Sequence, residues 1–178
     1  MYIEPEVESS YSLNNLGKTI YDQIRLLKPD LVIDFGVLNG YSTICIAQAL
    51  RDNGKGRVKA YDLFEKYEFN HSQLEKLVKN LKEYGVLDLV DIEERNFFDW
   101  IKNPEPFDAI HIDLSNTGDI VDIIGSYLQN KGLVLFEGGS LDRDRAGWMV
   151  RYNKRPINDT KTKFEIINSA FPSISKLI

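Results

Sequence analysis

A carboxylate and a pair of glycines around position 36 have the spacing of a ligand-binding turn. Asp34 ends an apolar run, and Gly36 and Gly40 follow it with three residues between them. An apolar strand, a glycine-containing turn and a helix together form the nucleotide pocket of many α/β proteins. The middle glycine of the pattern G-x-G-x-x-G is absent here, and the Asp34 carboxylate repels phosphate and attracts an ammonium group. The turn therefore favours a ligand with a cationic arm over a dinucleotide.

A second carboxylate, Asp62, ends the next predicted strand, 22 positions after Gly40. In α/β nucleotide pockets an acidic residue in this place accepts hydrogen bonds from the hydroxyls of a ribose. Together with the ammonium preference of Asp34, it predicts an adenosine ligand that carries a cationic amino-acid arm.

Three further polar residues, His111, Asp113 and Glu137, come at the ends of two later predicted strands. His111 and Asp113 are two positions apart on one strand, so their side chains share a face. Asp113 and Glu137 end neighbouring strands and could approach one another. Asp113 or Glu137 could be a general base toward a hydroxyl, the pair with His111 could bind a cation, or the residues could be structural. We favour a role in the site for Asp113 and a hydrogen-bonded core position for His111.

A regular alternation of strands and helices must position these residues. Apolar runs predict strands at 31–35, 57–63, 88–94, 107–114 and 133–137, and helical periodicity predicts helices at 11–28, 42–53, 71–84 and 117–129. Strands without polar alternation are covered on both faces, so the fold class is α/β, with a doubly wound, Rossmann-like and mostly parallel sheet. The helical side chains expected to face the core are Leu13, Leu16, Ile20, Ile24, Leu27, Leu74, Leu77, Val78, Leu81, Ile120, Ile123, Ile124 and Tyr127.

Two aromatic-rich connections are expected to be loops. The segment 64–70, with Tyr67 and Phe69, could cover the adenosine or could be a packed connection. The segment after the third strand, with Phe97 and Trp100, leads to the fourth strand.

The C-terminal part of the chain departs from the strand–helix alternation. A basic helical piece is expected at 141–153, and strand-like runs at 163–167 and 173–177 flank Phe171-Pro172. We predict that these runs form a terminal antiparallel hairpin, which gives a sheet of about seven strands in all.

Residues 141–163 contain more basic than acidic residues, although the whole chain has a net charge of −5. A cationic segment directly after the fifth strand could bind a phosphate or carboxylate of a substrate. We favour the alternatives, a solvated helix with local Asp–Arg pairs or a subunit contact through Trp148, Met149 and Tyr152.

Composition places the chain among ordinary globular proteins. Its 178 residues and hydrophobic content of 43% suit one domain with a full core. The acidic net charge argues against general binding to nucleic acids or membrane surfaces. Cys45 is the single cysteine, which rules out a disulfide within the chain and fits a reducing compartment. The N-terminus is acidic and lacks an apolar run, so we expect no signal peptide and a cytoplasmic location.

The stretch Asp34-Phe-Gly36-Val-Leu-Asn-Gly40-Tyr41-Ser42 resembles the class I S-adenosylmethionine-dependent methyltransferases, in particular small O-methyltransferases such as the catechol and caffeoyl-CoA enzymes. The resemblance covers roughly residues 11–140. It implies a seven-stranded sheet whose last two strands form an antiparallel hairpin, and S-adenosylmethionine as the cofactor. We therefore expect a single methyltransferase domain over 1–178, with an N-terminal helical segment (1–29), a cofactor-binding core (30–140), and a basic segment with the terminal hairpin (141–178).

The resemblance also assigns cofactor-binding residues. Those implied are Asp34, Gly36, Gly40, Tyr41 and Ser42 around the methionine moiety, Asp62 at the ribose, Leu63, Asn96 and Phe97 at the adenine, and also Leu38 and Asp113.

The acceptor side matches the family less well. In its metal-dependent members, Asp113 corresponds to the aspartate that binds a divalent cation, and Asp-Asn follows strand five where this chain has Glu137-Gly138. The family's catalytic lysine corresponds to Asn116. Asp113 and Glu137 are therefore the candidate metal ligands, and Asp113, Glu137 and His111 are the candidate catalytic residues.

We expect O-methylation of a small molecule of anionic or sugar-like character, and the small size of the enzyme makes a homodimer plausible. One alternative is a catalytically degenerate domain that binds the cofactor or a partner without turnover. An NAD-dependent oxidoreductase is a weaker alternative because the middle glycine is missing. A nucleic-acid substrate is not expected.

Overall fold

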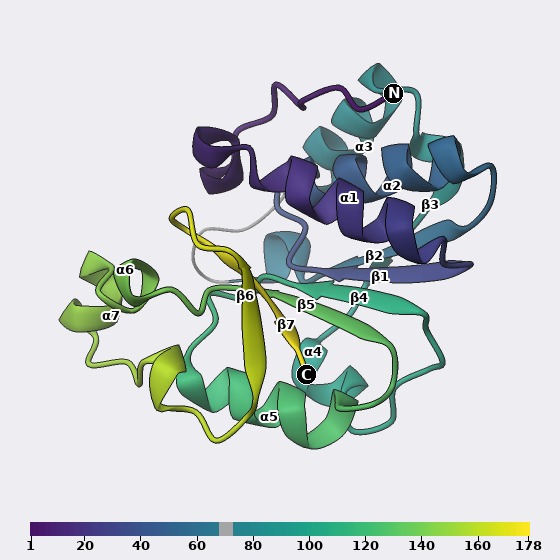
Figure 1. The fold of residues 1–178 in the computed structure, drawn as a ribbon. Coiled ribbons are helices and arrows are strands. Elements are labelled where there is room, and N and C mark those ends of the chain that lie inside the picture. Colours follow the sequence, from purple (N-terminus) through teal and green to yellow (C-terminus); the bar gives the residue numbers. More distant parts are fainter. Residues whose placement is uncertain (68–72) are drawn as a thin grey trace.

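The computed structural model describes residues 1–67 and 73–178, and at its centre is a seven-stranded sheet with helices on both faces (Figure 1). The strands are β1 (Leu31–Phe35), β2 (Arg57–Asp62), β3 (Val90–Glu94), β4 (Ala109–Ile112), β5 (Leu133–Glu137), β6 (Phe164–Asn168) and β7 (Ile174–Leu177). The helices are α1 (Leu16–Leu27), α2 (Tyr41–Asn53), α3 (Leu74–Glu83), α4 (Phe97–Trp100), α5 (Gly118–Leu128), α6 (Leu141–Asp144) and α7 (Gly147–Arg151). Short 3-10 helices occur at η1 (Ser10–Asn14), η2 (Phe64–Lys66), η3 (Leu87–Leu89) and η4 (Ile157–Asp159).

The strand order is β3-β2-β1-β4-β5-β7-β6. Strands β1 to β5 are parallel, and β7 runs antiparallel between β5 and β6. This arrangement confirms the predicted doubly wound, mostly parallel sheet with a terminal hairpin. The chain order reverses between β1 and β4, and in open α/β sheets ligands bind beyond the carboxyl ends of the strands at such a point. The register there sets Asp34 of β1 beside His111 of β4.

Two hydrophobic cores explain why the parallel strands lack polar alternation. Val32 of β1 belongs to the core on the side of α1, α2 and α3, and its neighbour Ile33 belongs to the core on the side of α4 and α5. Both side chains are fully buried. Since successive strand residues point to opposite faces of a sheet, a strand covered on both faces needs apolar residues at every position.

The first predicted helix, 11–28, is wrong as a continuous helix. Asn15 adopts a left-handed backbone (φ 53°, ψ 35°), which separates η1 from α1. Three of the predicted core side chains are buried, namely Leu16, Ile20 and Ile24. The other two are exposed, Leu13 at 78% and Leu27 at 44%, because Leu13 lies before the break and Leu27 lies in the last turn.

Helix α5 faces the core largely as predicted. Ile124 is fully buried and Ile120 and Ile123 are half-buried against the core, but Tyr127 is 44% exposed, and Val121 and Leu128, which were not predicted, are fully buried. Gly125 also faces inward, and a Cβ atom on it would lie 2.3 Å from Oγ1 of Thr162. The small residue therefore lets the C-terminal part of the chain pack closely against α5.

The segment expected as a loop after β3 contains the short helix α4. Asn96 caps it, since its side chain accepts a hydrogen bond from the Phe98 N–H at 2.8 Å. Phe97 and Trp100 are buried against the sheet. The following strand is shorter than the predicted 107–114.

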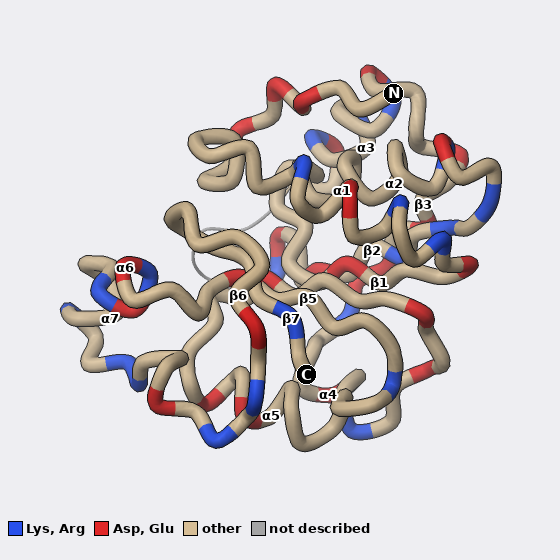
Figure 2. The backbone as a smooth tube through the Cα atoms, viewed as in Figure 1, with Lys and Arg blue, Asp and Glu red and all other residues tan. Residues whose placement is uncertain are grey.

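The basic segment forms two short helices, α6 and α7, in place of the single predicted helix. Basic and acidic positions are interspersed around them (Figure 2). Two of the arginines pair with acidic residues elsewhere in the fold, Arg143 with Glu137 and Arg155 with Asp122. Part of the positive charge of this segment is therefore neutralised by ion pairs within the chain.

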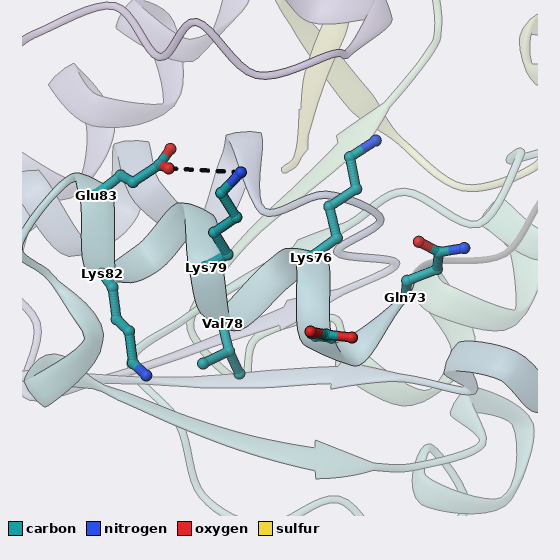
Figure 3. Close-up of a pocket in the computed structure, with 7 residues that line it drawn as sticks. Gln73, Lys76, Val78, Lys79, Lys82 and Glu83 are labelled. Atoms are coloured by element: carbon teal, nitrogen blue, oxygen red, sulfur yellow. Dashed lines mark ion pairs between the residues drawn. The ribbon is translucent and has the colours of Figure 1, made fainter.

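Helix α3 covers the outside of the first core. Leu77 and Leu81 face inward, while Leu74 is exposed at the first turn. The predicted helix start at 71 lies outside the described residues, as does Phe69. The outer face of α3 lines a hollow of about 640 Å³ between charged side chains such as Lys79 (Figure 3). None of the helices in the described ranges is long and apolar enough to cross a bilayer.

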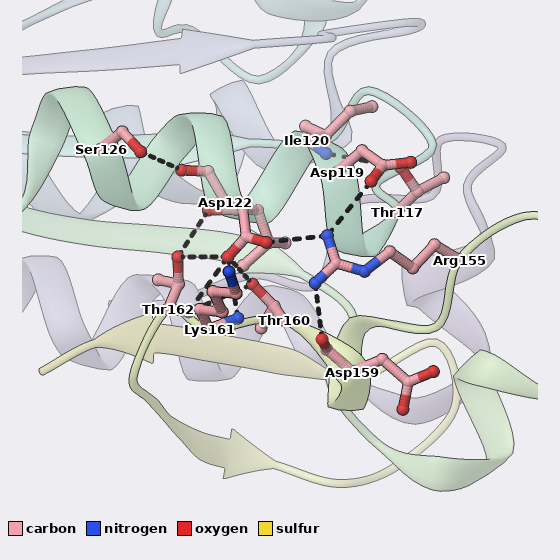
Figure 4. A network of polar contacts seen from close by, with 11 residues as sticks. Thr117, Asp119, Ile120, Asp122, Ser126, Arg155, Asp159, Thr160, Lys161 and Thr162 are labelled. Carbon is pink, nitrogen blue, oxygen red and sulfur yellow. Dashed lines mark hydrogen bonds and ion pairs between the residues drawn. The ribbon is translucent and has the colours of Figure 1, made fainter.

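A network centred on Asp122 fastens the chain after α7 to helix α5 (Figure 4). Its Oδ1 accepts hydrogen bonds from the N–H groups of Lys161 (2.9 Å) and Thr162 (3.1 Å) and from the hydroxyls of Thr160 and Thr162. Its Oδ2 accepts one from Nη1 of Arg155 at 2.8 Å. Partial burial raises the pKa of Asp122, but these hydrogen bonds lower it by more. The net pKa therefore lies well below the usual range. The network fixes the path by which the chain returns to β6.

We expect Asp122→Asn to lower the free energy of unfolding by about 2 kcal/mol at neutral pH, because an amide cannot accept all these bonds or pair with Arg155. The lowered pKa means that Asp122 stabilises the fold above its unfolded pKa of about 3.9, and that this effect is lost as the pH falls toward the folded pKa. Urea unfolding of both proteins across this range measures the difference. Asp119→Asn, an exposed partner of the same arginine, is the control. A difference that does not shrink in acid contradicts this account.

Candidate functional site

The turn between β1 and α2 begins with a glycine that the neighbouring backbone requires. Gly36 has a φ of 82°, and a Cβ atom on it would lie 1.9 Å from the carbonyl oxygen of Asp113. The Gly36 N–H donates to the carbonyl of Tyr61 at 3.1 Å, and the Asp113 N–H donates to the carbonyl of Phe35 at 2.9 Å. The carboxyl ends of β2, β1 and β4 are therefore joined directly at the predicted site.

Asp62 holds the same turn from the end of β2. Its Oδ2 accepts hydrogen bonds from the N–H groups of Val37 (2.9 Å) and Leu38 (3.3 Å), and its Oδ1 accepts one from Phe64 (2.9 Å). The residue is half-buried, and a carboxylate offers about four acceptor positions, so some capacity is left for a ligand. Asp62 thus both shapes the turn and faces the edge where a ligand would enter.

The turn ends at Gly40, whose φ of 93° places it in the left-handed region just before α2. Leu38 shares this unusual conformation with a φ of 45°. The first N–H groups of a helix have no partner within it, so the start of α2 offers donors to a ligand. Two predicted cofactor residues lie in this first turn: the Tyr41 hydroxyl donates to Glu4, and the Ser42 hydroxyl donates to Asp34.

Asp34 is fully buried beneath the turn. Its Oδ2 accepts hydrogen bonds from the hydroxyls of Ser42 (2.9 Å) and Thr43 (2.7 Å), and its Oδ1 lies 2.8 Å from Nδ1 of His111. These partners stabilise the carboxylate and tie β1 to the start of α2 and to β4. The predicted contact of Asp34 with an ammonium group stays a prediction.

His111 lies in a buried chain of hydrogen bonds between Asp34 and Tyr11. Its Nε2 lies 3.2 Å from the Tyr11 hydroxyl oxygen. Burial by itself lowers the pKa of His111, but the hydrogen bond and charge of Asp34, with the charges of Asp113 and Glu137, raise it above the usual value. Burial and the charges of Asp113 and Glu137 raise the pKa of Tyr11, which stays a neutral hydroxyl.

Asp113 follows β4 and is half-buried, in contrast to Asp34. Burial raises its pKa, and the charges of His111 and Arg143 and an interaction with the Tyr11 hydroxyl offset only part of that rise. A carboxylate with a raised pKa is a stronger base, closer to the pKa that proton transfer near neutral pH requires. Asp113 therefore combines partial exposure with basicity.

Glu137 ends β5 and forms a buried, two-pronged ion pair with Arg143. Nε of Arg143 donates to Oε1, and Nη2 donates to Oε2 at 2.7 Å. Burial raises the pKa of Glu137 to about 7, with a further contribution from the charge of Asp113 and against the lowering effect of Arg143. Asn116 joins the two strands, since its Nδ2 donates to the carbonyls of Ile112 and Glu137, both at 2.9 Å.

The residues predicted to bind a divalent metal do not fit that role together. Both carboxylate oxygens of Glu137 accept hydrogen bonds from Arg143. Glu137 therefore has no free carboxylate oxygen to coordinate a metal together with Asp113. Within residues 1–67 and 73–178, no group of three or more His, Cys, Asp or Glu side chains is placed to hold one ion.

The residues predicted to contact an adenine are divided between surface and core. Leu63 is half-buried before η2, and Asn96 is exposed on the wall of a hollow of about 440 Å³. Phe97 points into the second core, where its ring centroid lies 5.2 Å from that of Phe35. The side chain of Phe97 is therefore part of the core packing.

Two residues of the site, Tyr11 and Arg143, were not predicted from the sequence. Tyr11 is 100 positions from His111, and no local pattern links them. Arg143 belongs to the predicted basic segment, but its residue type does not distinguish it from Arg145 and Arg151, which are exposed.

Comparisons with known proteins agree on one kind of domain. A family model described as a methyltransferase domain matches residues 33–137, more than half of the chain. A comparison with curated proteins finds no match.

Solved structures share the fold at low sequence identity. The O-methyltransferase TomG from Streptomyces achromogenes, in complex with SAM, is 20% identical with a TM-score of 0.62, over 92% of this chain and 79% of that chain. An O-methyltransferase from Bacillus cereus, in complex with SAH, is 16% identical with a TM-score of 0.64, over 98% and 84%. A protein from Klebsiella pneumoniae is 22% identical with a TM-score of 0.55, over 75% of this chain, which spans 60% of that protein's length.

We expect His111 to titrate with a pKa above the ordinary value of about 6.5. NMR titration of the imidazole signals measures this directly, because the chain has two histidines and His71→Gln identifies the other. Asp34→Asn removes the main interaction that raises the pKa, so burial should then bring it below the ordinary value. The raised pKa implies that protonated His111 stabilises the fold below about pH 6.5 and that this effect is lost as the pH rises through the folded pKa. A wild-type pKa below 6 contradicts the proposed pairing.

Proposed function

The chain belongs to the methyltransferase-domain family, and from this premise we propose that it binds S-adenosylmethionine and transfers the methyl group to a hydroxyl oxygen of a small molecule. The solved structures of similar fold include O-methyltransferases with SAM or SAH bound. Their chemistry supports the choice of cofactor and of oxygen as the acceptor atom.

The observation that carries the proposal is the turn at residues 36–40 and its fastening by Asp62. The turn joins β1 to α2 at the point where the strand order reverses, which is where open α/β sheets bind ligands. Asp62 has acceptor capacity for ribose hydroxyls, and the start of α2 offers N–H donors to the carboxylate of the methionine moiety. Leu63 and Asn96 follow the ends of β2 and β3, and this supports a role for them beside the adenine.

The proposed chemistry is an in-line displacement assisted by a base. When bound, the cofactor supplies a methyl group on a positively charged sulfur. Asp113 accepts the proton of the acceptor hydroxyl as the new O–CH₃ bond forms and the S–CH₃ bond breaks. The position of Asp113 at the end of β4, its partial exposure and its raised pKa support this role.

The acceptor that we propose is a small molecule with hydroxyl groups, of anionic or sugar-like character, and not a nucleic acid. The net charge of −5 supports the exclusion of nucleic acids, since it opposes binding to a polyanion.

Calorimetric titration with S-adenosylmethionine, S-adenosylhomocysteine and NAD tests the cofactor. We expect saturable binding of the first two and none of NAD, and binding of NAD alone contradicts the proposal.

Asp62→Ala should weaken S-adenosylmethionine binding by roughly 10- to 100-fold, through lost ribose contacts and a looser turn. Glu94→Ala is the matched control, because Glu94 ends the neighbouring strand and is exposed. Unchanged affinity in Asp62→Ala removes Asp62 from this role.

Asp113→Asn should retain cofactor affinity and lose nearly all turnover, because an amide cannot accept the proton. The measurement is transfer of a labelled methyl group to a hydroxyl-bearing acceptor found by screening. Asp142→Asn, an exposed change on α6, is the control. Wild-type turnover by Asp113→Asn would show that another group takes the proton.

A further inference from the structure

The ends of β4 and β5 carry the two carboxylates that the family resemblance assigns to a divalent metal. A hard divalent cation needs carboxylate oxygens that are free to coordinate it. Asp113 is half-buried, but Glu137 is 4% exposed and bonded through both oxygens to one guanidinium. The cation at the end of β5 is therefore the guanidinium of a side chain, Arg143.

The backbone is built to bring Arg143 back onto Glu137. Gly138 and Gly139 follow Glu137 with φ angles of 110° and 105°, which residues with a side chain rarely adopt. The Ser140 hydroxyl oxygen then caps α6 by accepting a hydrogen bond from the Arg143 N–H at 3.3 Å. The reversal over so few residues sets the guanidinium opposite the carboxylate.

The guanidinium is also held from its other sides. Nη2 donates to the backbone carbonyl of Asn116 at 3.2 Å, and the guanidinium carbon lies 4.7 Å from the centre of the Trp148 ring. Nη1 of Arg143 and Oδ1 of Asn116 are buried and have no hydrogen-bond partner among the residues that the structure describes. One NH₂ group of this cation, that of Nη1, is therefore uncommitted, although the charge itself is fixed in place.

Asn116 strengthens the same conclusion. It occupies the position that corresponds to the family's lysine, and its amide nitrogen is committed to the carbonyls of Ile112 and Glu137. Arg143 thus supplies positive charge at an edge where the chain lacks that lysine, and its charge also acts on Asp113.

We propose that the Arg143 guanidinium takes the place of the divalent cation at the ends of β4 and β5, so that this methyltransferase site does not bind a metal. The inference deepens the proposed function and rests on it for its meaning. Its test, metal binding by the protein alone, is separate from cofactor binding.

The experiment is a titration with Mn²⁺ followed by electron paramagnetic resonance, in which bound Mn²⁺ loses the sharp signal of the free ion. The wild-type protein should leave the signal unchanged. Arg143→Met keeps much of the apolar length of the side chain but frees Glu137, so it should gain stoichiometric Mn²⁺ binding. Adding Glu137→Gln to that variant should weaken the gained binding by about 10-fold or more. Arg155→Met, which removes another ion-paired arginine of the basic C-terminal segment, should gain nothing.

Stoichiometric Mn²⁺ binding by the wild type that is lost in Asp113→Asn overturns the proposal, and so does a folded Arg143→Met protein that gains no binding. Circular dichroism establishes which variants are folded. If Arg143→Met does not fold, the wild-type titration and Arg143→Lys, which retains the charge and should not bind Mn²⁺, decide the question. If the protein fails to bind S-adenosylmethionine, the proposed function fails while the Mn²⁺ result still stands.

Discussion

The site depends on one buried carboxylate, that of Asp34. It lies at the end of β1 without exposure to solvent, and an isolated charge there would be strongly unfavourable. Its hydrogen bonds to Ser42, Thr43 and His111 compensate for that cost and connect two other elements, α2 and β4, to β1. Through Tyr11, the same chain of contacts reaches the N-terminal segment. The position of the glycine turn above Asp34 therefore follows from a requirement for charge compensation inside the protein.

The second constraint is the distribution of charge at the ends of β4 and β5. Asp113 and Glu137 are neighbours in space, and each raises the pKa of groups around it. Arg143 compensates for part of this negative charge by binding the Glu137 carboxylate, and Asp113 remains half-buried beside it. The two carboxylates therefore have different environments, with Asp113 half-buried and Glu137 held in a buried ion pair.

Much of the fold could be predicted because it depends on local patterns. Continuous apolar strands predicted the parallel sheet. The turn at Asp34 indicated a methyltransferase, and the matching family model, a methyltransferase domain, confirms this. The left-handed backbone at Asn15 was not predictable, since asparagine is also compatible with a helix. The pairings Tyr11–His111 and Glu137–Arg143 depend on where distant or reversing segments come to lie, and residue types alone do not specify that. The sequence thus indicated which strand ends bring charged side chains together, but not how their charges are balanced.

The missing side chain of Gly36 has a consequence for how this protein can vary. The carbonyl of Asp113 occupies the space where a Cβ atom would stand, so the backbones of β1 and β4 touch at the point where the two halves of the site meet. An alanine at position 36 would push the end of β4, and with it the Asp113 carboxylate, away from the turn. The proposed cofactor turn and the proposed proton acceptor Asp113 are thereby mechanically coupled, so a substitution at one also displaces the other. Diversification toward new acceptors is then easier in the segments that follow β4 and β5 than at the strand ends themselves.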